Sequence, residues 1–222
     1  MSDLNESSKS KRWFTDAQRA VLAGHILDIG AGEDPVTADA VVFDLEEGDA
    51  NRITSFEAES FDCVYSSHCL EHMRHPPSTL LNWWSLVKRG GSLFLIVPDE
   101  DLYEQGVFPS RFNSDHKSTF TLGKKRSWSA RSFNVYAMCS ALPGARVESL
   151  YLNDIGYDRA LSAHGLPAKG ILRRVRRFYD SLRKRNLIPK NSNFEKQTAG
   201  TVTRDQTSGD AMAQIEVIVR KL

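Results

Sequence analysis

A short apolar run that ends in a glycine turn constrains the fold of this chain more than any other feature. Residues 25–29 have the composition of a buried strand and lead into Gly30-Ala31-Gly32. Glycine permits a tight turn and a close approach of a ligand, because it has no Cβ. Asp28 would then lie at the carboxyl edge of a parallel sheet, where open α/β folds bind ligands. We therefore expect an α/β protein with a ligand site at this turn.

The residues after the turn argue against a dinucleotide site. The dinucleotide fingerprint needs a third glycine, and Glu33, Asp34 and Pro35 follow Gly32 instead. An acidic loop is also a poor cradle for a pyrophosphate. The turn therefore suits a ligand with a cationic or hydroxyl-bearing part, although such turns also occur for packing reasons alone.

Further apolar runs extend the pattern toward a parallel sheet. Residues 40–44 read as a second buried strand that ends in Asp44, and a carboxylate at this position holds a ribose in α/β nucleotide sites. Residues 60–72 leave a strand for a polar segment that contains histidines. An apolar helical stretch at 80–87 precedes another expected strand at 92–98. Alternation of this kind is typical of strands joined by crossovers.

In their order, these motifs closely resemble those of the class I S-adenosylmethionine-dependent methyltransferases, over about residues 20–142. The resemblance implies an α/β fold with a Rossmann-like, doubly wound sheet, mostly parallel with an antiparallel C-terminal strand. It implies S-adenosylmethionine as the cofactor. The residues that it implies for cofactor binding are Asp28, Gly30, Ala31, Gly32, Asp44, Leu45, Asp49, Ala50, Ser66 and His68.

The chain departs from the usual family pattern in the spacing of its first strands. Only short segments separate Gly32 from Asp44 and Asp44 from Asp49. Full-length helices would not fit there, because a helical crossover takes about a dozen residues or more. This compact variant resembles methyltransferases of bacterial surface-polysaccharide pathways, particularly through residues 66–72 and 98–117. The resemblance implies methyl transfer to a hydroxyl of a sugar or glycoconjugate.

A polar and aromatic segment, about residues 99–128, directly follows an expected strand. We expect it to cover the ligand edge as a lid or substrate loop, since long insertions in compact domains are usually functional or mobile. His116, beside Asp115, is the first candidate for a general base, because histidine titrates near neutral pH. A purely structural pairing of these two residues is the alternative, and His72 is the next candidate base. The expected acceptor-binding residues are Tyr103, Arg111 and Asn113.

Two histidines after the expected strand at 60–67 raise the question of a metal. His68 and His72 have the i, i+4 spacing that places side chains on one helix face, and such a pair can bind a metal. No third or fourth ligand is evident nearby in the sequence. We therefore predict no metal site, and expect one imidazole to face the cofactor and the other to be hydrogen-bonded within the fold.

Composition bounds the domain organisation and the partners. With 222 residues, a single domain is the default, and we expect a methyltransferase domain at 13–222 after a disordered N-terminus at 1–12. A net charge of +1 gives no bulk attraction to nucleic acid. Three cysteines make no disulfide framework, and no apolar run reaches the roughly 18 residues of a membrane span. These features favour a cytoplasmic protein.

A basic amphipathic segment at about 166–190 is the remaining distinctive feature. It could attach to the anionic inner face of a membrane or to a lipid-linked substrate. It could contact nucleic acid phosphates, but no nucleic-acid module supports that interpretation. It could also pack on the domain with a solvated arginine face.

Other functions stay open at this point. The chain could methylate another small molecule or a lipid, or act as a noncatalytic scaffold with the cofactor fold. A nicotinamide or flavin enzyme is disfavoured by the missing third glycine.

Overall fold

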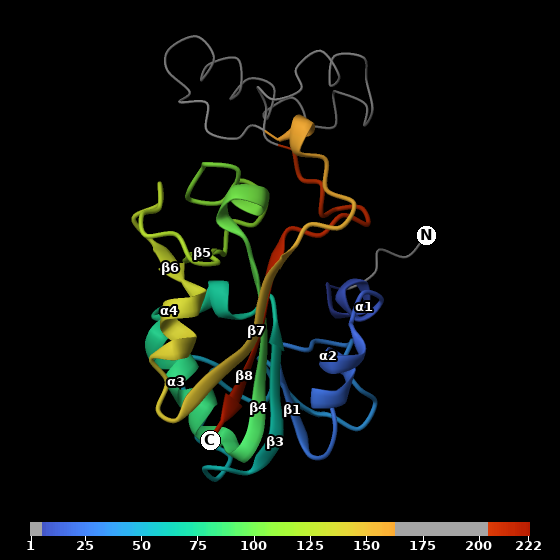
Figure 1. Cartoon of the computed structure of the whole chain (residues 1–222), viewed down its shortest axis with the longest axis vertical. Coiled ribbons are helices and arrows are strands. Elements are labelled where there is room, and N and C mark those ends of the chain that lie inside the picture. Colours follow the sequence, from blue (N-terminus) through green and yellow to red (C-terminus); the bar gives the residue numbers. More distant parts are fainter. Residues whose placement is uncertain (1–5, 163–203) are drawn as a thin grey trace.

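A six-stranded sheet forms the centre of the molecule (Figure 1). The computed structural model describes residues 6–162 and 204–222. The strand order is β2-β1-β3-β4-β8-β7, with β2, β1, β3 and β4 parallel and β8 antiparallel to both of its neighbours. The strands are β1 (Ile26–Ile29), β2 (Val41–Phe43), β3 (Phe61–Ser67), β4 (Val87–Pro98), β7 (Ala145–Asn153) and β8 (Gln214–Lys221). The predicted fold class is confirmed.

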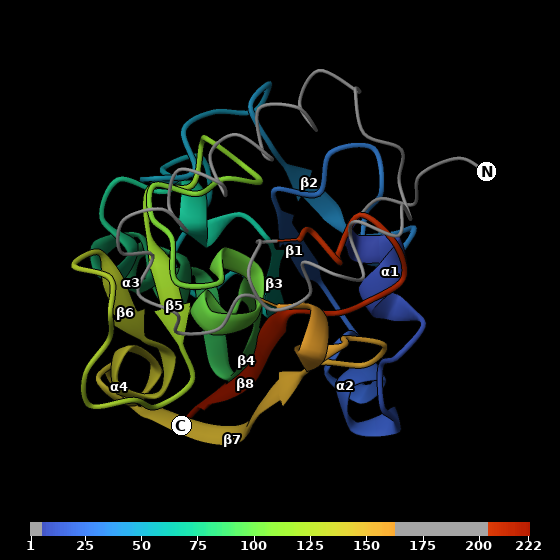
Figure 2. The same cartoon turned by 90° about the horizontal axis from the view of Figure 1, so that it is seen from above.

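Helices cover both faces of this sheet, as the view from above shows (Figure 2). One face carries α1 (Glu6–Lys11) and α2 (Asp16–Val21), and the other carries α3 (Pro76–Leu86) and α4 (Val135–Ser140). A small parallel sheet beside α4 pairs β5 (Thr119–Thr121) with β6 (Ser132–Asn134). The shorter helical turns are η1 (Leu70–His72), η2 (Glu100–Glu104) and η3 (Arg159–Leu161).

The alternation of side chains along each strand builds two apolar layers. Leu27 and Ile29 of β1 belong to the cluster that contains Trp83 of α3, whereas Ile26 belongs to the cluster around Phe14. Successive strand residues point to opposite faces, so both faces of the sheet are buried, as expected for parallel strands. The carboxyl ends of β1, β2 and β3 remain available for a site.

The first crossovers of the fold lack helices. Segments 30–40 and 44–60, which connect β1 to β2 and β2 to β3, consist of turns and bends in the described chain. The short spacing in the sequence predicts this, because a helix and its two loops need more residues.

The N-terminus corrects one prediction. Part of the segment expected to be disordered at 1–12 is the helix α1, and it packs beside the loop that follows β1. Ser8 donates to Asp34 through its backbone N–H (2.7 Å) and its hydroxyl (2.8 Å), and Lys11 forms an ion pair with the same carboxylate at 2.8 Å. The prediction failed because polar contacts with a distant loop, rather than an apolar pattern, hold this helix.

Side-chain caps mark the start of two short helices. The helix α2 begins after a capping box between Thr15 and Gln18. The Asn134 side chain caps α4, directly after Ser132–Asn134 pairs with β5.

The remaining sequence predictions concern segments outside the sheet. Figure 1 shows that the segment after β4, which contains η2 and β5, rises beyond the carboxyl end of that strand. The basic segment at 166–190 lies outside the described residues. Among the residues that the structure describes, there is no helix with the length and apolarity needed to cross a bilayer.

Candidate active site

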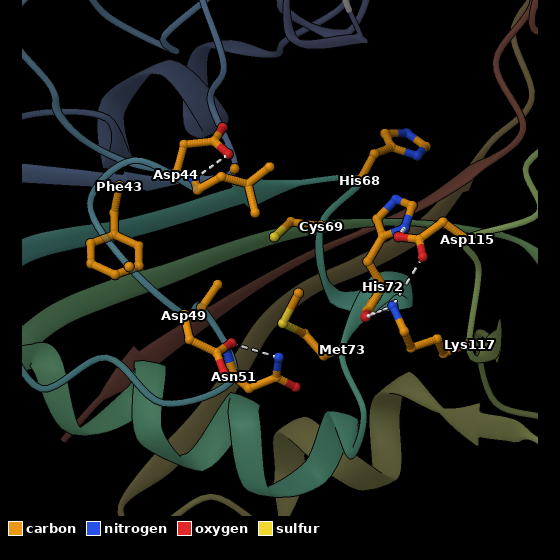
Figure 3. A pocket seen from close by; sticks show the side chains of 14 residues that line it. Phe43, Asp44, Asp49, Asn51, His68, Cys69, His72, Met73, Asp115 and Lys117 are labelled. Atoms are coloured by element: carbon orange, nitrogen blue, oxygen red, sulfur yellow. Dashed lines mark hydrogen bonds and ion pairs between the residues drawn. The ribbon is translucent and has the colours of Figure 1, made fainter.

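A cavity of about 360 Å³ lies at the carboxyl ends of β1 and β2 (Figure 3). It is lined by Gly30, Phe43, Asp44, Leu45, Gly48, Asp49, Ala50, Asn51, His68, Cys69, His72, Met73, Asp115 and Lys117. Six of these residues are predicted cofactor-binding residues: Gly30, Asp44, Leu45, Asp49, Ala50 and His68. We call the part of the cavity formed by segments 30–32 and 43–51 the cofactor edge.

The glycine turn shapes the bottom of the cofactor edge. Gly30 has a φ of 82°, and a Cβ built on it would lie 2.7 Å from the Cβ of Cys69. Gly32, with a φ of 56°, donates its N–H to Asp44 at 2.7 Å. Only glycine satisfies both the left-handed backbone and the close approach at position 30. The turn therefore packs closely against Cys69, which also lines the cavity.

Asp28 lies behind this turn rather than on the cavity wall. Its Oδ2 accepts the N–H of Val36 at 2.6 Å, while its Oδ1 is buried without a hydrogen-bond partner in the described chain. Burial raises the pKa of Asp28 to about 7, against smaller opposing effects of the Val36 N–H and of Lys11. A buried carboxylate oxygen without a partner fits a cationic group of a ligand. The ammonium of S-adenosylmethionine is such a group.

Two further carboxylates lie on the cofactor edge. Besides the Gly32 N–H, Asp44 accepts the N–H of Leu45 at 2.7 Å. Asp49 accepts both the backbone and the side-chain N–H of Asn51, and these bonds lower its pKa. Each carboxylate has about four acceptor positions, so both can still bind the hydroxyls of a ribose.

Besides Asp28, three predicted cofactor residues do not line the cavity. Ala31 and Ser66 are buried, and the Ser66 hydroxyl donates to the Ile29 carbonyl at 3.0 Å, which ties β3 to β1. Gly32 acts through its bond to Asp44. These residues shape the cofactor edge from behind.

His68 forms the back of the cavity and is held by the last strand. Its Nε2 lies 3.0 Å from Oε1 of Gln214 in β8. The amide of Gln214 donates in turn to Glu216 (2.9 Å) and to Ser10 of α1 (3.0 Å). Because that amide nitrogen faces a carboxylate, its oxygen faces His68, and the Nε2 of His68 carries a proton.

The predicted catalytic residues meet in one group, but with different pairings. Nδ1 of His72 lies 2.9 Å from Asp115, and Lys117 holds the same carboxylate at 3.2 Å (Figure 3). Asp115 therefore pairs with His72 and not with its sequence neighbour His116. We call Glu71, His72, Glu104, Asp115 and His116 the histidine cluster.

His116 lies one layer deeper than His72. Its Nδ1 is 2.7 Å from Glu104, and its ring stacks on Tyr103 at 5.1 Å. Its Nε2 lies 3.9 Å from Glu71, and its ring meets that of His72 edge to face at 5.0 Å. The ring is 3 % exposed and does not line the cavity. Nothing local in the sequence indicated Glu104 as its partner.

Glu71 is the deepest member of the histidine cluster. It is fully buried, and neither carboxylate oxygen has a hydrogen-bond partner in the described chain. Nδ1 of His68 lies 3.3 Å from its Oε1. Burial alone would raise the pKa of Glu71, but the interaction with His68 and the other imidazoles holds it below its usual range.

The predicted acceptor-binding residues support this group from outside the cavity. Tyr103 lies between His116 and Phe112. The Asn113 side chain accepts the N–H of Asp115 at 3.1 Å and so shapes the loop that carries it. Arg111 is half-buried in the same segment. None of the three predicted residues lines the cavity.

Comparison with known proteins shows the family to which the chain belongs. A family model described as a methyltransferase domain matches residues 11–134, more than half of the chain. No curated protein matches the sequence. A putative methyltransferase from Bacillus halodurans C-125 is similar in structure, with a TM-score of 0.52 and 18% identity over 92% of this chain and 96% of that one. A putative sarcosine dimethylglycine methyltransferase from Galdieria sulphuraria has a TM-score of 0.50 and 12% identity, over 96% and 86% of the two chains.

At these identities the structural matches show the fold, and the family model shows the membership. The glycine turn, the buried Asp28 oxygen and the carboxylates of the cofactor edge fit the cofactor of that family. The chain belongs to the class I S-adenosylmethionine-dependent methyltransferases, and S-adenosylmethionine is its cofactor.

Proposed function

We propose that this enzyme methylates a hydroxyl of a sugar or glycoconjugate, in bacterial surface-polysaccharide biosynthesis. The observation that carries the proposal is that His72 and Asp115 line the same cavity as Gly30 and Asp44. A pair that can take up a proton therefore faces the space next to the cofactor edge. A hydroxyl acceptor needs such a group, because an alcohol is a poor nucleophile until its proton is removed.

The cofactor edge supplies a group for each part of the cofactor. S-adenosylmethionine supplies an electrophilic methyl group when bound. Asp44 and Asp49 would hold the ribose hydroxyls, and Leu45 and Ala50 would flank the adenine. Asp28 would face the ammonium group from behind the glycine turn. Positioning of this kind accounts for much of the rate in a displacement reaction.

The histidine cluster would receive the proton of the acceptor. Asp115 accepts the Nδ1–H of His72, and Glu104 accepts that of His116. With a proton on Nδ1, the neutral form of each ring keeps a lone pair on Nε2. We keep His116 as the predicted base, and His72 as the ring that lines the cavity and meets the acceptor first. Tyr103, Arg111 and Asn113 would shape the acceptor side.

The segment at 99–128 would act as the lid of this site. The segment carries Glu104, Asp115 and His116. Closing it over the site would therefore also assemble the histidine cluster. Buried Glu100 anchors it through hydrogen bonds to the hydroxyls of Ser127 (2.7 Å) and Ser132 (2.5 Å). Exclusion of water in this way would protect the reaction.

The test joins cofactor binding to a survey of acceptors. We expect calorimetric titration to show binding of S-adenosylmethionine and S-adenosylhomocysteine. Release of S-adenosylhomocysteine would then be followed with monosaccharides, nucleotide sugars, lipid-linked saccharides, amines and lipids. Mass spectrometry of an O-methylated saccharide would support the proposal. Transfer confined to amines or to lipids without sugars would contradict it.

We further propose a cytoplasmic enzyme that contacts the inner face of the membrane through residues 166–190. The three cysteines are free thiols, as in proteins of a reducing compartment. Co-sedimentation with anionic vesicles that fades with salt would support the contact, since screening weakens such binding. Equal binding to neutral vesicles, or none to either, would contradict it.

A further inference from the structure

The carboxylate of Glu71 is enclosed among imidazoles. It is fully buried, neither oxygen meets the geometry of a hydrogen bond in the described chain, and Nδ1 of His68 lies 3.3 Å from Oε1. A buried ionised group without hydrogen bonds is unfavourable unless a charge compensates it. Three imidazoles surround it, from His68, His72 and His116. This arrangement has the composition of a ligand set rather than of an apolar core.

We propose that Glu71, His72 and His116 bind a divalent transition-metal ion. One ligand atom from each residue can be chosen so that all three lie within 4.8 Å of one another. Nε2 of His116 is 3.9 Å from Oε1 of Glu71. Ligand atoms at about 2.0–2.2 Å from a tetrahedral ion are roughly 3.4 Å apart. Small rotations of side chains would therefore close the site around an ion.

The outer partners of both imidazoles support this assignment. Glu104 lies 2.7 Å from Nδ1 of His116, and Asp115 lies 2.9 Å from Nδ1 of His72. A histidine that binds a metal usually donates its other N–H to a carboxylate or carbonyl, which fixes the ring and its tautomer. Here both rings have such a carboxylate. Each ring therefore offers its Nε2 lone pair to an ion.

The ligand types select the class of metal. Two imidazoles and one carboxylate suit zinc, iron, cobalt or nickel, whereas magnesium and calcium prefer oxygen ligands alone. Three protein ligands leave at least one coordination position open, as in catalytic metal sites. His72 also lines the cavity, so the ion would lie next to the space for the acceptor.

The catalytic consequence rests on the proposed function, although the binding of the ion does not. An acceptor hydroxyl at the open position would lose its proton to water more readily than a free alcohol. A ring nitrogen bound to the ion cannot also accept that proton. The metal-loaded cluster would thus activate the hydroxyl in place of a free imidazole base.

The test measures metal binding without cofactor or acceptor. The full chain, freed of any histidine tag, is stripped with a chelator and titrated with Co²⁺, whose visible absorption reports imidazole and carboxylate coordination. We expect one equivalent to bind, and Zn²⁺ to displace it. His72→Ala and His116→Ala should each weaken binding at least ten-fold, and Glu104→Gln about 10–100-fold, as is usual for an outer carboxylate.

Controls keep a loss of folding apart from a loss of ligands. The His72 side chain is 25 % exposed, so His72→Ala is the variant least coupled to packing, and its thermal unfolding is recorded alongside. His25→Ala is the matched control, because His25 precedes β1 at the opposite end of the sheet from the cavity. It should bind Co²⁺ with unchanged affinity.

The outcomes separate this inference from the proposed function. No binding of Co²⁺ at millimolar concentration, or equal affinity in the folded His72→Ala variant, would overturn the metal site and leave His68 as the counter-charge of Glu71. Failure to methylate sugars would leave a positive metal result standing. Full methyl transfer by the stripped enzyme would remove only the catalytic consequence.

Discussion

The cofactor edge and the histidine cluster face each other across one cavity but are built in opposite ways. At the cofactor edge, carboxylates are bound by backbone N–H groups of nearby turns, as in Asp44 with Gly32 and Leu45. In the histidine cluster, Glu71 and Glu104 are buried, and Asp115 reaches His72 across 43 positions of the chain. Local turns thus organise the cofactor edge, and long-range packing organises the histidine cluster.

This difference predicts how each region responds to substitution. A changed side chain on the cofactor edge should alter cofactor affinity and leave the fold intact, since its neighbours are close in sequence. A change in the histidine cluster should alter turnover and stability together, because buried polar groups depend on one another.

The largest effect should come from His116→Ala. Turnover should fall by about 10²–10⁴, the usual range for loss of proton transfer, while affinity for S-adenosylmethionine stays within twofold in calorimetry. His75→Ala, which removes a histidine from the start of α3, is the control. Retained turnover with a lowered melting temperature would make His116 a structural member of the cluster.

Asp28 is buried behind the cofactor edge, and its ionisation should make the free energy of unfolding depend on pH. Its pKa is about 7 in the fold and 3.8 without the fold's influence. Between these values the native state holds a proton that the unfolded chain has lost, so the free energy of unfolding should fall as pH rises, by roughly 4 kcal/mol over the window. Chemical denaturation at pH 4 and pH 8 measures this slope.

Asp28→Asn should remove that slope, whereas the exposed Asp39→Asn should keep it. The cofactor should act in the opposite direction, because its ammonium favours the ionised carboxylate. Affinity for S-adenosylmethionine should therefore rise as pH increases through 7, and this rise should vanish in Asp28→Asn. If the free energy of unfolding still falls with pH in Asp28→Asn, another titrating group causes that dependence.

Asp44→Ala should weaken binding of S-adenosylmethionine by about 1.5–3 kcal/mol, as expected for loss of a charged acceptor. Asp44→Asn separates the ribose contact from the two backbone bonds, since an amide oxygen can still accept one of them. Asp39→Ala, in the same β1–β2 region but outside the cavity, is the control. If Asp49→Ala weakened binding and Asp44→Ala did not, Asp49 rather than Asp44 would hold the ribose.

Leu45→Ala should have the smallest effect. The side chain is 90% exposed on the cavity wall, so its truncation removes nothing from the folded core. Loss of contact with the adenine should weaken binding by about 1 kcal/mol, with no change in melting temperature. Leu81→Ala, at an exposed position of α3, should leave binding unchanged.

The sequence predicts the elements that depend on local pattern. The strand before Gly30, the acid after β2 and the absence of helices at 30–40 and 44–60 all follow from spacing and turn chemistry. The helix α1 does not, because its stability comes from contacts with Asp34. Likewise β6 depends on its pairing with β5, which the local sequence does not indicate.

The residues of the site also differ in how far the local sequence predicts them. The cofactor-edge residues are close to the glycine turn and could be listed from the motif order. The pairing of His116 with Glu104, and of Asp115 with His72, depends on how the segment after β4 folds back over η1. No local signal fixes that register, and Asp115 stands nearer to His116 in the sequence.

The amide of Gln214 has a practical consequence for handling the protein. It joins His68 on the cavity wall to Ser10 of α1, so α1 helps to position that part of the wall. Figure 1 places the C-terminus at the far end of β8 from that support. An affinity tag or a fusion partner therefore belongs after Leu222. Trimming the chain back to Trp13, a common step to improve crystals, would remove α1 and should yield an enzyme that folds but holds its cofactor less well.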